Sequence, residues 1–440
     1  MSPLLVGVLL FVAMLLLMAI RVPIAIAMFI PGAIGYVVLS SEAALLSHLK
    51  GALFARLSVY DLSVIPLFLL MGQFATQGGL SAALFRAAAA FVGHFRGGLA
   101  MAAMLACTAF GAICGSSVAT AATVAQVALP EMKRFNYSGR LATATLAAGG
   151  TLGILIPPSV VLVIYAILAQ QNIAKLFAAA IIPGLIAAGG YLLAIGVYSR
   201  LHPGHGPAQP RVPWPERMRT LAGVWPVAAI FLIVFGGIYA GIFTPTEGAG
   251  VGAVFTFLAG LFNRELTLAA IRRSFLGAAE TSGMIFMIFI GADMLNSALA
   301  LSQMPAQLAE TVGRLDVPPL VIVGGVLVFY VILGCVMDEL SMILLTIPVL
   351  FPAIMGLDLY GLDATEKAIW FGILVLMVVE IGLIAPPVGL NVYVVNGLAP
   401  DVPMAETYRG VVPFLITDAI RVLLLLAFPV ISLWAVRLMK

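Results

Sequence analysis

The sequence predicts an all-α polytopic membrane protein made of two inverted repeats, each with a re-entrant hairpin and a broken helix. Composition indicates the membrane class, because 62% of residues are hydrophobic and 9% are charged, whereas a soluble domain carries about 25% charged residues. Two matching interruptions indicate the repeat. They are GGTLGILIPPS at 149–159 and VEIGLIAPPVGLN at 379–391, each inside a run apolar enough to cross a bilayer.

The double prolines Pro157, Pro158, Pro386 and Pro387 predict helix breaks at membrane depth. Proline removes an amide donor and clashes with the preceding turn, so a helix cannot continue unbroken. The freed carbonyls are tolerated in a membrane only where protein buries them or a polar cavity receives them. A single double proline is usually only a kink, but a matched pair in two halves favours a binding site.

Two apolar segments with polar, glycine-bearing centres are predicted to be hairpins. They are 99–130, which contains GAICGSSVAT, and 319–355, which contains GCVMDELSM. Half-length apolar arms on both sides of such a centre are typical of a chain that enters and leaves on the same side. The predicted spans are 4–20, 24–40, 63–78, 141–170, 181–199, 222–242, 248–262, 279–297, 369–398 and 413–436.

Four landmarks recur in both halves at nearly constant spacing, as an internal duplication predicts. The pairs are Pro23 with Pro245, Gly72 with Gly291, Pro130 with Pro352, and Pro157 with Pro386, at offsets of 222, 219, 222 and 229 residues. In this span order the two repeats begin on opposite sides of the membrane. Their topology is therefore inverted.

The basic residues predict the orientation. Of the 22 lysines and arginines, fourteen fall on one side, seven fall on the other and Arg421 lies within the last span. This bias places the larger group in the cytoplasm. Both termini would then be periplasmic, although the basic C-terminal RLMK argues against this.

Several other classes are disfavoured. The net charge of +3 is scattered among loops, which indicates no nucleic-acid partner. The three cysteines form no CxxC pattern, so neither disulfides nor a metal knuckle is predicted. The four histidines lie in loops or at segment ends without catalytic partners, so an enzyme is not expected.

Seven motifs, in order, resemble the large membrane (permease) subunit of tripartite ATP-independent periplasmic (TRAP) transporters over nearly the whole chain. They are RVPIA, IPLFLLMG, FGAICGSSVAT, GTLGILIPPS, GIFTPTEGAGVGA, MDELSMILLTIPVLFP and EIGLIAPPVGLNVYV. The chain departs from the family at Gly248 and Gly250, where alanine is frequent, and at Ala385, where threonine is frequent. The last change alters polarity beside the second break.

The resemblance implies an ion-transporter-type, elevator-like fold in the bacterial inner membrane and sodium-driven uptake of organic anions. It also implies two partners, a small four-span membrane subunit and a periplasmic solute-binding protein. The first repeat would be 1–199, with scaffold spans 4–40 and a transport part 63–199. A cytoplasmic linker would occupy 200–221. The second repeat would be 222–440, with scaffold spans 222–262 and a transport part 279–436.

Two or more sodium sites are expected where hairpins meet broken helices, because a hard cation prefers hydroxyl, carboxylate and carbonyl oxygens. The candidates are Gly115, Ser116, Ser117, Gly150, Thr151 and Gly153 in the first repeat, and Asp338, Glu380 and Gly382 in the second. Two alternatives stay open. The glycines can serve only close helix packing, and the two carboxylates can merely form pairs near an interface.

Ser117, Thr120, Ser159 and Asn391 are the candidate substrate contacts. No lysine or arginine is expected in the core, so a carboxylate would rely on helix N-terminal amides and bound sodium. Sialic acid, a four-carbon dicarboxylate, another sugar acid and an amino-acid derivative all remain possible solutes. The alternative function is a stand-alone sodium- or proton-coupled anion transporter or exchanger with the same hairpin plan.

Overall fold

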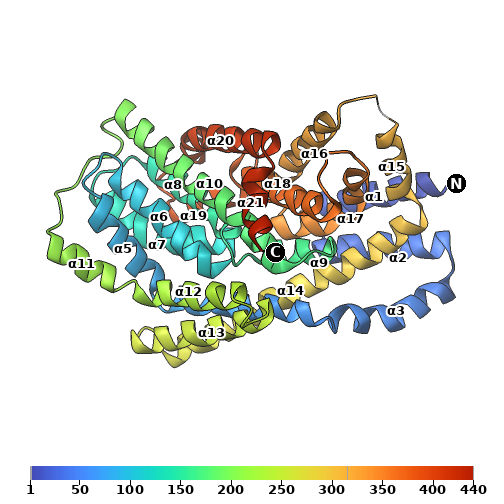
Figure 1. Cartoon of the computed structure of the whole chain (residues 1–440), viewed down its shortest axis with the longest axis horizontal. Helices are drawn as coiled ribbons and strands as arrows, with labels where there is room; N and C mark the ends of the chain where they lie inside the picture. Colours follow the sequence, from blue (N-terminus) through green and yellow to red (C-terminus); the bar gives the residue numbers. More distant parts are fainter. Residues whose placement is uncertain (1, 315, 440) are drawn as a thin grey trace.

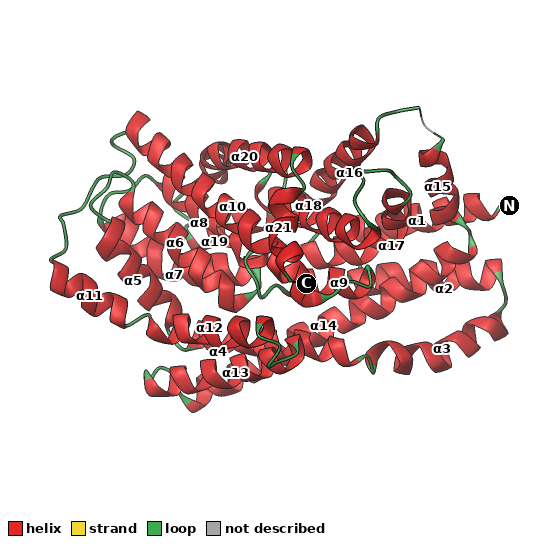
Figure 2. Cartoon of the chain, in the orientation of Figure 1, coloured by secondary structure: helices red, strands yellow, loops and turns green. Residues whose placement is uncertain are grey.

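The computed structural model describes residues 2–314 and 316–439, where all regular structure is helical (Figures 1 and 2). The helices of the first half are α1 (Pro3–Ala19), α2 (Ile24–Leu39), α3 (Glu42–Leu57), the 3₁₀ helix η1 (Tyr60–Ser63), α4 (Val64–Gln77), α5 (Leu80–Val92), α6 (Gly98–Cys114), α7 (Ser117–Arg134), α8 (Gly139–Leu155), α9 (Val160–Leu168) and α10 (Ile173–Leu201). Those of the second half are α11 (Trp214–Ala222), α12 (Trp225–Tyr239), α13 (Pro245–Phe262), α14 (Leu268–Leu301), α15 (Met304–Gly313), α16 (Pro319–Gly334), α17 (Glu339–Met355), α18 (Ala364–Ile384), α19 (Leu390–Leu398), α20 (Met404–Ala427) and α21 (Val430–Leu438).

The apolar helices account for the predicted spans. Five described helices, α10, α13, α14, α18 and α20, are long and apolar enough to cross a membrane. Three bent pairs, η1/α4 with α5, α8 with α9, and α11 with α12, raise this number to eight. The shorter apolar helices α1 and α2 have 17 and 16 residues, so each is roughly 25 Å long at 1.5 Å per residue. Together these elements correspond to the ten expected segments.

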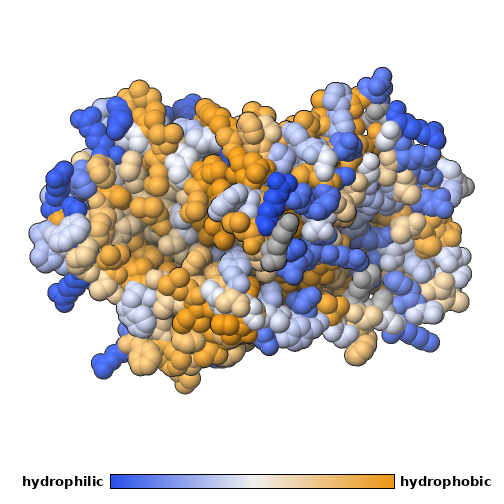
Figure 3. Space-filling view, in the orientation of Figure 1, coloured by the Kyte–Doolittle hydropathy of each residue, from blue (hydrophilic) through white to orange (hydrophobic). Residues whose placement is uncertain are grey.

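The surface agrees with a membrane location. Figure 3 shows hydrophobic residues over much of the left and lower parts of the visible face, while hydrophilic residues lie at both ends of the long axis and also near the middle. Large apolar side chains such as Val38 of α2, Leu232 of α12 and Phe262 of α13 are exposed. These helices therefore contact lipid or another membrane protein.

Each repeat contains a hairpin and a broken helix in the predicted order. The hairpin of α6 and α7 lies in the left part of Figure 1 and the hairpin of α16 and α17 in the right part, with α8, α10, α18 and α20 between them. Contacts between the halves are reciprocal, because α2 packs on α14 while α4 packs on α13, and α7 packs on α19 while α9 packs on α17. This exchange is what two repeats related by a pseudo-two-fold axis require.

The breaks follow from local sequence. In the first repeat, Ile156 leaves α8 in an extended conformation and Ser159 caps α9 by accepting a hydrogen bond from the Leu162 amide. In the second, Ala385 leaves α18 in the same way and Gly389, at φ +56°, begins α19. The Pro157–Pro158 and Pro386–Pro387 peptide bonds are both cis. The four prolines therefore lie in the breaks, where the sequence predicts them.

Each hairpin touches its own broken helix through a pair of glycines. A Cβ built on Gly111 of α6 would lie 2.7 Å from the Gly153 Cα of α8. A Cβ built on Gly382 of α18 would lie 2.5 Å from the Gly334 carbonyl carbon of α16. Such distances are shorter than any normal carbon contact. Only glycine therefore permits these backbones to pack so closely.

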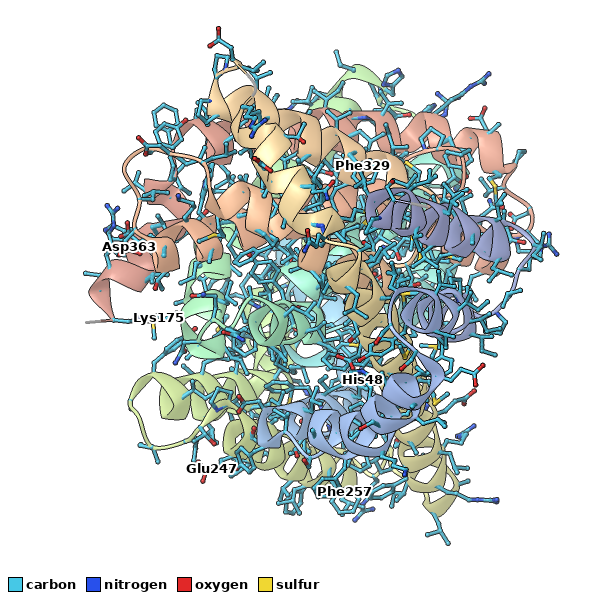
Figure 4. All side chains as sticks on the ribbon, turned by 90° about the vertical axis from the view of Figure 1, so that its right-hand side faces the viewer. His48, Lys175, Glu247, Phe257, Phe329 and Asp363 are labelled. Atoms are coloured by element: carbon cyan, nitrogen blue, oxygen red, sulfur yellow. The ribbon has the colours of Figure 1, made fainter. Side chains whose placement is uncertain are left out.

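Two features go beyond the sequence prediction. The segment between the halves contains a helix, α11, and its preceding loop hydrogen bonds to the base of the first hairpin, where the Gly97 amide donates to the Gly206 carbonyl at 2.8 Å. A further helix, α3, runs along the edge of the molecule. Its His48 lies beside α14 (Figure 4), with Nε2 3.8 Å from the Asp293 carboxylate.

The glycine contact in the first repeat generates a stability prediction. Gly153→Ala should lower the free energy of unfolding by about 1–3 kcal/mol, because the new methyl group would overlap the Thr120 hydroxyl and lie 2.7 Å from the Ser116 carbonyl oxygen. The measurement is the thermal unfolding midpoint in detergent. Gly324→Ala is the matched helical control, since a methyl group there meets nothing within 4 Å. Equal midpoints for the two variants would contradict the prediction.

Candidate functional site

The tip of the first hairpin lies directly against the first broken helix. Gly115 adopts φ +66° at the turn, and a Cβ there would lie 2.9 Å from the Pro158 carbonyl oxygen. At the start of α7, the Ser116 carbonyl oxygen and the Thr120 side chain both contact Gly153 of α8. Carbonyl and hydroxyl oxygens of two elements therefore meet at one point inside the membrane.

Gly150 brings the second repeat into this contact. A Cβ on Gly150 would lie 2.9 Å from the Ser117 carbonyl oxygen and 3.0 Å from the Asn391 Nδ2 atom. Asn391, at the start of α19, donates from Nδ2 to the Ala147 carbonyl at 3.2 Å. Its Oδ1 atom is buried and has no hydrogen-bond partner. Leaving an amide oxygen buried and unpaired costs about 1–3 kcal/mol, so this atom is a candidate ligand.

Thr120 and Ser159 are both fully buried but differ in their bonding. Within the described residues Thr120 Oγ1 has no oxygen or nitrogen hydrogen-bond partner, although it interacts with the Cys114 thiol. Ser159 Oγ accepts from the Leu162 amide at 3.3 Å. Thr120 is therefore available to a ligand, whereas Ser159 already caps α9.

Asp338 is the N-cap of α17 at the tip of the second hairpin. Its Oδ2 atom accepts from the Ser341 amide at 3.1 Å, and the side chain is half-buried. Gly382 packs against the same hairpin through Gly334. The second hairpin thus packs on the second broken helix in the same way as the first hairpin packs on the first broken helix. Asp338 caps α17 at the position where Ser116 caps α7.

Glu380 belongs to a buried ion-pair network. Its Oε2 atom lies 3.2 Å from Arg421 Nη2, which also lies 3.0 Å from Asp418 Oδ1. All three side chains are at most 3% exposed. The expectation that the core holds no lysine or arginine is therefore wrong, because α20 places Arg421 between two carboxylates. Glu380 Oε1 has no hydrogen-bond partner.

The network continues to the first broken helix. Tyr191 on α10 donates to Asp418 Oδ2 at 2.8 Å, and its hydroxyl lies 3.2 Å from Thr151 Oγ1. Thr151 also donates to the Ala148 carbonyl at 2.7 Å. The Thr151 hydroxyl is thus occupied by the Ala148 carbonyl and lies beside the Tyr191 hydroxyl. A continuous polar chain links the breaks of α8 and α18 through α10 and α20.

Glu339 is the main residue that sequence reasoning missed. It follows Asp338 directly, is 8% exposed, and accepts a hydrogen bond from Ser117 Oγ to its Oε1 atom at 3.4 Å. This contact joins the tips of the two hairpins across the repeat boundary. The second acidic residue in the centre of this apolar hairpin could have indicated a functional role for Glu339. The direction of its side chain depends on α17 beginning at residue 339, which the sequence alone does not show.

A cavity of about 700 Å³ lies between the hairpin and the broken helices on the side of the interrepeat loop. Its lining includes Gln126 on α7, Thr143 on α8 and Glu406 on α20. Glu406 pairs with Arg140 at 2.6 Å, and Lys133 pairs with Asp401 at 2.8 Å. These groups belong to the end of the molecule where the basic residues predict the cytoplasm.

The His205 ring borders the same cavity. Partial burial, helped by the nearby His202 and Arg140, lowers the pKa of His205. Its Nδ1 atom lies 2.8 Å from the Tyr198 hydroxyl.

The donor set of the site suits an alkali cation. No group of three or more His, Cys, Asp or Glu side chains that could hold a metal ion occurs within residues 2–314 and 316–439. Hydroxyl, amide and carbonyl oxygens predominate instead, and two of these buried oxygens, Thr120 Oγ1 and Asn391 Oδ1, have no oxygen or nitrogen partner. Hard cations prefer such oxygens over nitrogen or sulfur.

A helical membrane protein with paired hairpins and broken helices around a central polar site is a multi-pass transporter. The model of the family described as "Tripartite ATP-independent periplasmic transporter, DctM component" matches residues 11–431. The chain therefore belongs to this family of large permease subunits, as its motifs predict.

Known proteins agree with the assignment. The C4-dicarboxylate TRAP transporter large permease protein DctM of Pseudomonas aeruginosa is 36% identical over 382 residues, 87% of each chain. The ectoine/5-hydroxyectoine TRAP transporter large permease protein UehC of Ruegeria pomeroyi is 28% identical over 96% of this chain and 97% of its own. The YdaH transporter structure of Alcanivorax borkumensis has a TM-score of 0.62 over 97% of this chain and 98% of its own, at 15% identity, which shows a shared fold.

The buried ion-pair network predicts a strong effect of losing its cation. Arg421→Met should lower the free energy of unfolding by about 3–5 kcal/mol, because Glu380 and Asp418 would remain buried without a positive partner. Thermal unfolding midpoints in detergent measure the loss. The triple variant with Glu380→Gln and Asp418→Asn should recover most of it. A triple variant no more stable than Arg421→Met would contradict the charge-burial explanation.

Proposed function

We propose that this protein carries out sodium-coupled uptake of an organic anion across the bacterial inner membrane, delivered by a periplasmic solute-binding protein. One observation carries the proposal. The tips of both hairpins and both broken helices converge on buried oxygen atoms, and Ser117 and Glu339 connect the two repeats at 3.4 Å. Such a central site is where a transporter of inverted repeats binds its ion and solute.

One sodium ion would bind where the first hairpin meets α8. The carbonyls of Ser116 and Ser117 face Gly153 and Gly150, and Thr120 Oγ1 is unpaired beside them. A second ion would use Asp338 and the carbonyls near Gly382. Sodium and the solute are both cargo in this scheme, so binding of one would favour binding of the other by charge neutralisation.

The solute carboxylate would be held mainly by backbone amides. The N-terminus of α7 begins at Ser117, at the centre of the molecule, where its first amides have no partner within the helix. An anion at this position also gains from the helix dipole. The neighbouring sodium would supply the remaining positive charge, because the buried Arg421 is already paired.

An elevator-type movement accounts for access from both sides. The hairpins, broken helices, α10 and α20 would form the moving unit, and α2, α4, α13 and α14, which pack across the repeats, would form the scaffold. The 700 Å³ cavity lies at the end predicted to be cytoplasmic. The site would open to the cytoplasm through this cavity, whose present lining includes none of Ser117, Thr120 and Asn391. The exposed apolar faces of the scaffold helices suit a small membrane subunit.

The decisive experiment is uptake into proteoliposomes containing this protein and its small membrane subunit. We expect uptake of a carboxylate solute only with an inward sodium gradient and the solute-loaded binding protein outside. Potassium in place of sodium is the control for ion identity. Uptake that persists without sodium would refute the coupling.

The alternative function is a stand-alone anion transporter or exchanger. The shared fold of the YdaH transporter, which covers nearly the whole chain, is the observation that keeps it under consideration. The same vesicles distinguish the two functions. Equal uptake rates with and without the binding protein would favour the stand-alone transporter.

Asp338 provides a prediction that separates charge from helix capping. Asp338→Ala should abolish sodium-dependent uptake, and Asp338→Asn, which can still cap α17, should also lose it. We expect a loss of about 10–100-fold for either variant, as removal of a charged ligand costs roughly 1.5–3 kcal/mol. The unfolding midpoint of the asparagine variant should match the wild type. Uptake retained by Asp338→Asn but lost in Asp338→Ala would reduce Asp338 to a structural cap.

A further inference from the structure

Glu339 is a buried carboxylate without a positive partner. Within the described part of the chain its carboxylate accepts a 3.4 Å hydrogen bond from Ser117 Oγ and one from its own backbone amide, but it forms no ion pair with a lysine, arginine or histidine. Arg421 is the one buried guanidinium among the described residues. Its Nη2 atom pairs with Glu380 and Asp418, its Nε and Nη1 atoms have no hydrogen-bond partner, and it forms no ion pair with Glu339. Burying a charge without a partner is costly, so a cation beside Glu339 would stabilise its charged form.

A second buried acceptor lies on the other side of Ser117. The Ser117 carbonyl and Asn391 Nδ2 both lie within 3.0 Å of one point on Gly150, and Asn391 Oδ1 is fully buried and unpaired. Ser117 therefore contacts Glu339 through its hydroxyl, and its carbonyl oxygen lies near the side-chain amide of Asn391. An ammonium group donates three hydrogen bonds and accepts none, so it matches this arrangement.

A carboxylate could bind beside Ser117 as well. The N-terminus of α7 starts at Ser117 and presents amide donors. A solute with a carboxylate and a cationic nitrogen a few bonds apart could engage both sets of groups at once. A plain dicarboxylate would place its second negative charge near Glu339, where like charges repel.

We propose that the solute of this transporter carries a positively charged nitrogen as well as a carboxylate, and that Glu339 is the residue that selects it. This inference rests on the proposed function and adds the substrate class to it. The charge at the tip of the second hairpin would then distinguish zwitterionic solutes from simple dicarboxylates. Specificity by repulsion of the wrong solute is a common device.

The test compares solutes that differ only by one ammonium group. Succinate and aspartate share a four-carbon dicarboxylate skeleton, and glutarate and glutamate share a five-carbon one. Binding to the protein, purified with its small membrane subunit, is measured by thermal shift and titration in sodium and in potassium. The binding protein is left out so that its own selectivity does not enter.

In the wild type we expect each nitrogen-bearing solute to bind at least about tenfold more tightly than its partner without nitrogen. Glu339→Gln should weaken the nitrogen-bearing solute by about 10–100-fold, for loss of a charge-assisted hydrogen bond. It should leave the plain dicarboxylate unchanged or bind it more tightly. Glu310→Gln, on the exposed face of α15, is the control and should change neither.

The outcomes separate the inference from the proposed function. Equal or tighter binding of succinate and glutarate by the wild type would overturn the role of Glu339 and leave sodium-coupled anion uptake standing. A Glu339→Gln variant that weakens sodium binding without changing the solute ratio would also overturn it, since Glu339 would then be an ion ligand. No sodium-dependent binding of any carboxylate would instead refute the proposed function itself, and the inference with it.

Discussion

The interruption of helices inside the bilayer is the constraint on which this structure depends. A broken helix exposes carbonyl and amide groups that lipid cannot hydrogen bond, so another part of the protein must cover them. Here the hairpin tips do so, and they approach closely enough only because Gly111 faces Gly153 and Gly334 faces Gly382. The backbone carbonyl oxygens that the hairpin tips shield from lipid are therefore the same oxygens that we propose as ligands for sodium.

Charge burial is the second constraint on the centre of the molecule. Arg421 compensates Glu380 and Asp418, and Tyr191 carries the network to Thr151 on the other broken helix. This network connects the broken helix α8 to the broken helix α18 and so holds the two breaks in a fixed relative position. Buried polar atoms without a hydrogen-bond partner remain both in this network, at Arg421 Nε and Nη1, and at the hairpin tips, at Thr120 Oγ1 and Ser341 Oγ, among the described residues.

Much of the fold could be predicted from the sequence. The all-α class, both hairpins, both breaks and the family follow from apolar runs, from glycine and proline positions and from motifs in order, and the structure and relatives confirm them. The site was predicted less completely. Gly150, Gly153 and Asn391 do meet the first hairpin, but Glu339 and the pairing of Arg421 were missed, because both depend on which face of a helix turns inward. The sodium ligands and the domain boundaries remain predictions.

The sequence by itself determined where the chain crosses the membrane and where it cannot stay helical, since both are local properties of hydropathy and of proline and glycine backbones. Only the tertiary structure decided which polar groups share one site. Ser117 and Glu339 are 222 residues apart in the chain and 3.4 Å apart in space. No local pattern encodes that distance, because it results from the packing of two inverted repeats against each other.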